Sequence, residues 1–201
     1  MCVAEVFSVV KDITLSTAAC VTAYVAWTGL EKWQKELKGK ANFDVARKLA
    51  KSVYSLRDTV SNCRSPFTAA AEFPEGYDWV KHTVEEEGQA WVYIYQKRWE
   101  PVANAVRCFD ASTLEAEALW GKEIKEKVDE LRKCVHYLQA YIQAFISNKY
   151  SGGENFKNRD FANKTEEAVW DVIKDKNELT QRINNAIEGI ESVIRPHLSR
   201  N

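Results

Sequence analysis

An uncharged run of eighteen residues, positions 13–30, constrains the fold of this chain more than any other feature of its sequence. Lys11 and Asp12 precede the run, and Glu31 and Lys32 follow it. Eighteen helical residues rise about 27 Å, which is close to the hydrocarbon thickness of a bilayer. The run therefore predicts either a membrane-spanning helix or the most apolar helix of a soluble bundle.

The flanks of this run favour a membrane span. Tyr24, Trp27 and Trp33 gather toward its C-terminal end, where amphipathic aromatic rings prefer the lipid headgroups. Four lysines follow directly, at positions 32, 35, 38 and 40, so by the positive-inside rule this end faces the cytosol. Charged residues before the run argue against a cleaved signal peptide. We expect a single pass with the C-terminal body in the cytosol.

The alternative is a cytoplasmic protein whose first helix is buried in an oligomer interface. Threonine, serine and glycine dilute the leucine, isoleucine and valine that drive insertion into lipid. Small residues also recur every four positions, at Thr14, Ala18, Thr22 and Ala26. Because such spacing lets two helix backbones approach closely, we predict that these residues and Trp27 form a membrane or oligomer face. The same residues could instead simply fill a weakly apolar helix.

The overall composition favours an all-α fold and disfavours a nucleic-acid binder. Only four prolines and eight glycines occur in 201 residues that are rich in alanine, glutamate, lysine and leucine. The 28 basic and 29 acidic side chains nearly cancel, which removes the positive field that general binding to nucleic acid requires. We predict an antiparallel helical bundle with a long N-terminal, transmembrane helix.

Apolar residues recur at helical spacing through most of the remaining chain. The strictest pattern alternates steps of four and three along one predicted helix, through Ile124, Val128, Leu131, Val135, Leu138, Ile142 and Phe145. Similar patterns cover residues 45–63, 91–109 and 179–197, and all are typical of bundle or coiled-coil packing. Gly39 after a basic turn predicts the end of the first helix, and Asn42 then caps the next. The predicted domains are residues 1–38, the anchor helix with its cytosolic extension, and residues 39–201, the bundle.

Several residues predict where the later helices begin and end. Thr83 with Glu86 forms a capping box, and Ser112 with Glu115 repeats it at the start of a short helix. Pro101 removes a backbone donor and is expected to kink or divide the helix that contains it. A glycine at position 121 should interrupt the chain before the strictest pattern begins.

No residue pattern in the sequence points to catalysis, a cofactor or a metal. The five cysteines are scattered without a Cys-x-x-Cys pair, and the three histidines lie far apart. Neither a glycine-rich phosphate loop nor a Gly-x-Ser-x-Gly elbow occurs. Neighbouring glutamates such as Glu166 and Glu167 do not face each other on a helix. We therefore expect no enzyme activity, no cofactor and no small-molecule substrate.

Residues 64–82 break the helical periodicity with two prolines and a glycine, yet they are rich in aromatic residues. Such a loop is either packed on the bundle or displayed for a partner. Arg57 and Arg64 lie two helical turns apart and could present one cationic edge, or they could form salt bridges that brace the loop. The candidate recognition residues are Arg57, Arg64, Phe67, Phe73, Tyr77 and Trp79.

The stretch "GLEKWQKELKGKANFDVARKLAKSVYSLRDTVSNCRSPF" resembles a family of small uncharacterised bacterial proteins with one N-terminal membrane helix and a cytosolic helical region. The segments "RWEP", "LEAEALWG" and "IRPHL" also resemble this family, so the likeness spans nearly the whole chain. The matching residues in the first stretch are Trp33, Leu37, Gly39, Ala46, Arg47, Tyr54, Arg57, Asp58, Arg64, Pro66 and Phe67. The resemblance implies a membrane helix and a bacterial or phage source, and no activity.

These observations together predict a bacterial inner-membrane protein that works through protein contact, as a scaffold, sensor or accessory subunit. Its expected partners are the membrane and either a second protein or another copy of itself. The soluble oligomer described above is the alternative. A membrane-disrupting effector is a further, less favoured hypothesis.

Overall fold

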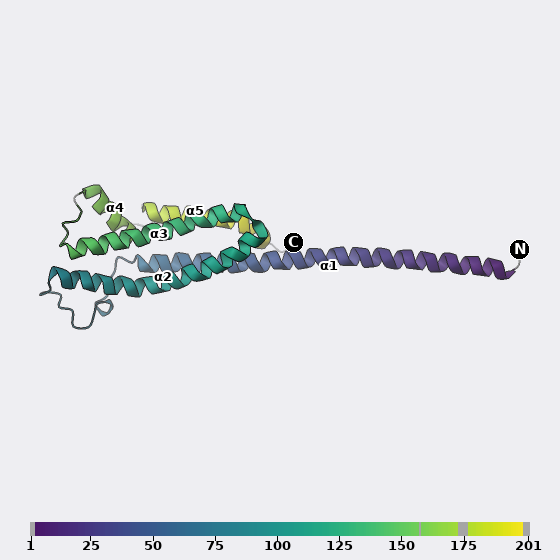
Figure 1. Cartoon of the computed structure of the whole chain (residues 1–201), viewed down its shortest axis with the longest axis horizontal. Coiled ribbons are helices and arrows are strands. Elements are labelled where there is room, and N and C mark those ends of the chain that lie inside the picture. The colour runs from purple at the N-terminus through teal and green to yellow at the C-terminus, as the bar shows by residue number, and fades with distance from the viewer. Residues whose placement is uncertain (1–2, 157, 173–176, 199–201) are drawn as a thin grey trace. The chain divides into compact units, whose positions relative to one another are not determined.

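The computed structural model describes residues 3–156, 158–172 and 177–198, and every long element within them is an α-helix. The helices are α1 (Val3–Cys63), α2 (Val84–Trp120), α3 (Lys122–Tyr150), α4 (Arg159–Val169) and α5 (Glu178–Leu198), with a short 3₁₀ helix, η1 (Ala70–Glu72) (Figure 1). The chain forms two compact units, Met1–Asp44 and Val45–Asn201. The all-α prediction is confirmed for the described residues.

Helix α1 does not end at Gly39, so the predicted stop and the predicted cap at Asn42 are wrong. A glycine inside a helix costs only about 1 kcal/mol relative to alanine, and lysines and an alanine surround this one. No neighbouring group forces a turn, because a Cβ added at Gly39 would meet nothing within 4 Å. The domain boundary placed at residue 38 rested on that stop and stays a prediction.

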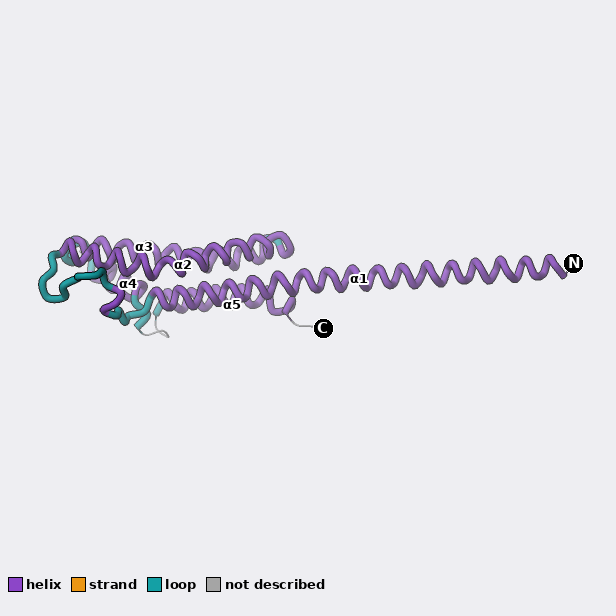
Figure 2. The backbone as a smooth tube through the Cα atoms, turned by 90° about the horizontal axis from the view of Figure 1, so that it is seen from below, coloured by secondary structure: helices purple, strands orange, loops and turns teal. Residues whose placement is uncertain are grey.

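The core of the second unit is built on α3, which contacts α2, α4 and α5. Figure 2 shows α3 running alongside α2. All seven members of its predicted apolar pattern, from Ile124 to Phe145, are buried. From α1, the buried residues include Leu49, Val53 and Leu56. Each such side chain contributes about 1.5–3 kcal/mol when it leaves water. The helical periodicities predicted for these two segments are confirmed.

Polar contacts join the last five turns of α1 to α2. The hydroxyls of Ser52 and Ser112 lie 2.6 Å apart in the interior, and Lys48 Nζ lies 3.0 Å from a carboxylate oxygen of Glu115. The prediction that Ser112 caps a separate short helix is wrong, since it lies inside α2 and its hydroxyl donates to the Phe109 carbonyl. Packing against α1 has overridden the local capping signal.

Helix α2 runs without division through Pro101, which is exposed to solvent. Water can hydrate the carbonyl that the missing proline N–H would have bonded, so the helix tolerates the ring there. At its start, the predicted capping box is confirmed, with Thr83 and Glu86 bonded reciprocally. At its end, Gly121 adopts a positive φ of 67°, which favours glycine, and joins α2 directly to α3.

Candidate functional site

The segment between α1 and α2 packs an aromatic cluster onto α2, which we define as Phe73, Tyr77 and Trp79 of the loop with Trp91 of α2. The ring centroid of Phe73 lies 5.0 Å from that of Tyr77, 4.0 Å from that of Trp79 and 6.0 Å from that of Trp91. Phe73 and Tyr77 are half-buried, whereas Trp79 is 53% exposed. The loop is therefore packed onto α2 through Phe73 and displays Trp79 at the surface. Phe67, earlier in the loop, is 75% exposed.

Beneath this cluster the aromatic contacts continue into the core. The Trp91 ring meets the buried ring of Phe145 at 5.1 Å, and Phe145 meets Trp170 at the same distance. Lys149 Nζ lies 5.7 Å from the Trp91 centroid, 5.6 Å from the Phe145 centroid and 2.9 Å from a carboxylate oxygen of Glu87. A lysine is thus held between aromatic faces and a carboxylate, a combination that attracts cations.

Arg98 of α2 fixes the first part of the loop. Its Nε lies 2.6 Å from a carboxylate oxygen of Glu72, and its two terminal nitrogens donate to the carbonyls of Ser65 and Phe67, each at 2.8 Å. Its side chain is almost completely buried. Since a guanidinium presents five donors in a rigid fork, one residue satisfies several loop acceptors at once.

Arg64, predicted to be part of a recognition edge, is instead the largest fully buried side chain. Its Nε donates to the Ala168 carbonyl at 2.7 Å, and its terminal nitrogens donate to Thr180 and Asn177, also at 2.7 Å. Asp171 supplies the opposite charge at 3.8 Å. Burial lowers the pKa of Arg64, and Asp171 opposes that shift. Arg64 ties the end of α1 to the α4–α5 connection.

Arg57 is exposed whereas Arg64 is buried, so the two side chains do not form the predicted cationic edge. Its guanidinium lies 5.1 Å from the ring centroid of Tyr54, and its Nε donates to Asp58 at 2.9 Å. Arg64 directly follows α1, and its position in the sequence did not reveal that the end of α4 and the start of α5 cover it. Of the two alternatives, a cationic recognition edge or bracing contacts, Arg64 fits the second.

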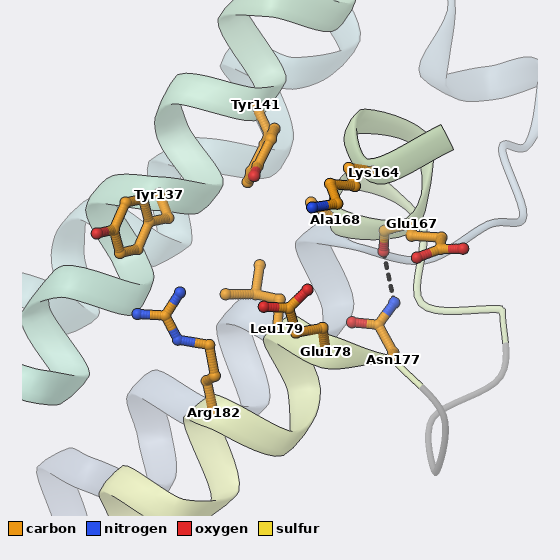
Figure 3. Close-up of a pocket in the computed structure, with 9 residues that line it drawn as sticks. All are labelled: Tyr137, Tyr141, Lys164, Glu167, Ala168, Asn177, Glu178, Leu179 and Arg182. Carbon is orange, nitrogen blue, oxygen red and sulfur yellow. Dashed lines mark hydrogen bonds between the residues drawn. The ribbon is translucent and has the colours of Figure 1, made fainter. Parts of the chain in front are cut away.

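A small pocket lies among α3, α4 and α5, and Figure 3 shows its side chains. The Arg182 guanidinium lies 4.7 Å from the ring centroid of Tyr137, and the Asn177 side-chain amide donates to the Glu167 carbonyl at 2.5 Å. The cavity measures about 40 Å³, which holds one or two waters, whereas ligand pockets span roughly 300–1,000 Å³. The pocket is therefore a polar junction between helices.

In the first unit, the predicted membrane or oligomer face is fully exposed. Thr14, Ala18, Thr22, Ala26 and Trp27 all lie on α1, and every described side chain from Ile13 to Ala41 is exposed. The first four follow one side of the helix, because residues four apart are neighbours on its surface. No described part of the chain covers this face.

Threonine hydroxyls within this stretch bond to the backbone of their own helix. Thr17 donates to the Ile13 carbonyl and Thr22 to the Ala18 carbonyl, each at 2.8 Å. Thr28 donates at 3.1 Å to the carbonyl of Tyr24. These bonds satisfy the hydroxyls without water or a second chain, which reduces the cost of placing them in an apolar environment.

Within residues 3–156, 158–172 and 177–198, no group of three or more histidine, cysteine or carboxylate side chains could hold a metal ion. Cys20 and Cys108 are exposed free thiols, whereas Cys63 and Cys134 are buried. Burial raises the pKa of the Cys63 thiol to about 11, so this thiol is protonated and unreactive at neutral pH.

Comparison with known proteins identifies no relative: no family model matches the chain, and no curated protein or solved structure matches it either.

Arg98 and Lys149 are the site residues that the sequence reasoning missed. Arg98 continues the apolar spacing Trp91, Tyr95, Val102, since it lies three residues after Tyr95 and four before Val102. An arginine on the apolar side of a helix signals a buried cation with distant acceptors. Lys149 carries no comparable signal, because two of its partners, Glu87 and Trp91, come from α2.

We predict that replacing Arg64 with alanine strongly destabilises the second unit. The change leaves Asp171 buried without its cation, and breaking such a pair costs about 3–5 kcal/mol. Urea unfolding of the full chain in mild detergent, followed by tryptophan fluorescence, measures the loss. Arg57→Ala is the matched control, and its exposed contacts should contribute less than about 1 kcal/mol. Equal losses in the two variants would contradict the assigned role of Arg64.

We also predict that the contact between Glu72 and Arg98 makes stability depend on pH. The hydrogen bond from Arg98 holds the pKa of Glu72 below its usual 4.5. The contact therefore stabilises the fold fully above that value, and this contribution is lost as pH falls through the lower folded pKa. Urea midpoints should show Glu72→Gln less stable than the wild type at pH 7, with the difference shrinking toward pH 3. Glu75→Gln should match the wild type throughout; a constant difference for Glu72→Gln would count against the contact.

Proposed function

We propose that the protein is a single-pass, membrane-anchored antiparallel helical bundle that works through protein contact. The observation that carries this proposal is the uncovered apolar surface of α1 between residues 13 and 30. Within the described chain, α1 is the one helix whose length and composition would allow it to cross a membrane, and its apolar window is wholly exposed. Large side chains such as Leu15, Val25 and Trp27 are each 58–67% exposed there. Apolar surface of this extent requires lipid or another chain to cover it.

The threonine bonds within α1 support lipid as the cover. In a bilayer, polar groups must find partners within the segment itself, and the hydroxyls of Thr17 and Thr22 already do so. Aromatic residues near the C-terminal end of the run and the lysines that follow it support a cytosolic interface at that end. On this basis the N-terminus lies outside and the second unit in the cytosol of a bacterial cell.

Displayed side chains on the second unit support action through contact. Phe67 is 75% and Trp79 is 53% exposed on the loop that Arg98 fixes. Tryptophan and other aromatic residues contribute much of the energy of protein interfaces. A scaffold, sensor or accessory subunit would use such a fixed surface without any chemistry of its own.

A specific observation also favours the soluble alternative, in which the first helix is buried in an oligomer interface. Exposed apolar residues continue beyond the uncharged run, to Trp33 at 58% and Leu37 at 47%. Together with Leu30 they are spaced three and four residues apart, as in helix pairs. Charged residues lie between them, so lipid is a poor cover for this part of α1.

We predict that two arginines placed in the run release the protein from membranes. A charged residue near the centre of a membrane helix costs about 2.5–3.5 kcal/mol on the insertion scale, so Val21→Arg with Val25→Arg should prevent stable insertion. The measurement is the fraction of full-length protein that stays in the pellet after carbonate washing of bacterial membranes. Wild type should stay in the pellet, and the double variant should move to the aqueous fraction.

The matched control is Leu114→Arg with Val172→Arg, which replaces two exposed apolar residues of the second unit. This control should stay in the pellet with the wild type. Wild-type protein in the aqueous fraction, as a monodisperse oligomer without detergent, would overturn the membrane assignment and support the soluble alternative.

We further predict that the exposed cysteines report the orientation. In a Cys2→Ser background, a membrane-impermeant maleimide should label Cys108 in inside-out vesicles but not in intact spheroplasts. Cys20 should stay unlabelled in both, because lipid covers the run. Labelling of Cys108 in spheroplasts would reverse the topology, and rapid labelling of Cys20 would place the run in water.

A further inference from the structure

The surface around Trp79 combines exposed aromatic rings with negative charge. We define the acidic-aromatic surface as Tyr77, Asp78, Trp79, His82 and Glu86. Tyr77 meets Trp79 edge-on at 5.5 Å and the His82 ring at 5.2 Å. The Nδ1 atom of His82 also lies 3.1 Å from the Asp78 carbonyl oxygen, and Asp78 lies between Tyr77 and Trp79 in the sequence. Burial, followed by the charges of Glu87 and Glu86, raises the pKa of Tyr77. Rings and carboxylates therefore lie together, on the end of the loop and the first turn of α2.

The two carboxylates of this surface are fixed and ionised. Asp78 accepts from the backbone N–H groups of Val80 and Lys81, at 2.8 and 3.1 Å. Glu86 accepts from the N–H of Thr83 at 2.6 Å. These backbone hydrogen bonds hold the pKa of each carboxyl below its usual range. Both side chains therefore carry a full negative charge at neutral pH.

Neither carboxylate is neutralised by a lysine or arginine of the described chain. Within the described residues, no lysine or arginine forms an ion pair with Asp78 or Glu86. Glu72 and Glu87, by contrast, are paired with Arg98 and Lys149. The negative charge at the surface is thus available to a cation from outside.

The protein already binds one of its own cations with the same combination of groups. Lys149 lies over the rings of Trp91 and Phe145 and forms an ion pair with Glu87. Trp91 belongs to the same aromatic cluster as Tyr77 and Trp79. The acidic-aromatic surface offers the same kinds of group, carboxylates and aromatic rings, with Trp79 and His82 exposed to solvent.

We propose that the acidic-aromatic surface docks a lysine or arginine side chain from a basic segment of a protein partner. This inference rests on the proposed action through protein contact and names the chemistry of that partner. The negative charge of Asp78 and Glu86 indicates which kind of partner can bind here, because it repels nucleic acids and anionic lipid headgroups. A basic protein segment satisfies both the carboxylates and the ring faces.

The surface is prepared for binding before a partner arrives. Arg98 holds the carbonyls of Ser65 and Phe67, and Phe73 packs on Trp91 beneath Trp79. A loop that is already ordered loses little conformational entropy when it binds. Docking then requires only that the partner's segment be ordered.

The test measures binding of a fluorescein-labelled peptide of alternating arginine and glycine to the full chain. The protein is kept in non-ionic detergent at about 0.15 M salt, and fluorescence anisotropy reports the Kd. Saturable binding is expected, and a peptide of alternating glutamate and glycine should not bind. Absence of saturable binding by the arginine peptide would overturn the proposal.

Two variants separate the contribution of the ring from that of the charges. Trp79→Ala should weaken binding about two- to fivefold, the contribution of an exposed cation–π contact. Asp78→Asn with Glu86→Gln removes both charges, while the amides can still accept the backbone hydrogen bonds. This pair should weaken binding by roughly fivefold, as expected for two exposed charge contacts.

Matched controls lie elsewhere on the second unit. Tyr137→Ala removes another exposed aromatic residue, and Glu166→Gln with Glu188→Gln removes two exposed charges. Both controls should bind like the wild type. Equal weakening in the controls would mean that the peptide responds only to the overall charge of the protein, and this would overturn the proposal. An unchanged Kd for Trp79→Ala would also overturn it, because the ring would then not contribute to binding.

A second copy of the chain is the remaining occupant, since residues 32–40 carry four lysines and Trp33. Sedimentation of the full chain in detergent tests it. Self-association that disappears in Trp79→Ala would assign the surface to a second copy and overturn a separate partner. The membrane anchor is tested by carbonate washing and not by peptide binding. A failed peptide test would therefore leave the proposed anchor standing. A failed carbonate test would likewise leave the measured Kd of the peptide unchanged.

Discussion

The uncovered apolar side of α1 is the constraint on which any account of this protein depends. From Ile13 to Leu37 the helix presents large apolar side chains to its surroundings, and no described part of the chain covers them. Their exposure in water would oppose solubility, because burial of apolar surface contributes about 25 cal/mol per Å². Lipid around residues 13–30 and helix contact around Trp33 and Leu37 are compatible covers, since they fall on successive parts of one helix.

Two buried arginines hold the second unit together at one end. Arg64 satisfies carbonyls and side chains of the α4–α5 connection, and Arg98 satisfies those of the loop after α1. Each guanidinium is costly to desolvate, so it stabilises the fold only while every acceptor stays in place. A segment with two prolines is thereby fixed, although it has no long helix of its own.

The sequence predicted the structural features that depend on local periodicity. The apolar positions of α1 and α3 were predicted because each helix buries one side, and Gly121 was found because a direct helix-to-helix turn requires a positive φ. The signals at Gly39 and Ser112 misled, since single-residue preferences of about 1 kcal/mol yield to the continuity and packing of the helix. The burial of Arg64 and of Arg98 was not predicted, because their acceptors lie 26 or more residues away in sequence.

Although the net charge of the chain is close to zero, basic and acidic side chains are concentrated in different parts of it. Four lysines lie between residues 32 and 40, where the proposed anchor leaves the bilayer, whereas Asp78 and Glu86 carry unpaired negative charge on the second unit. An anionic leaflet attracts the first group and repels the second. If the anchor is correct, the membrane itself discourages the acidic-aromatic surface from lying on the lipid, and so leaves it accessible to a basic segment in the cytosol.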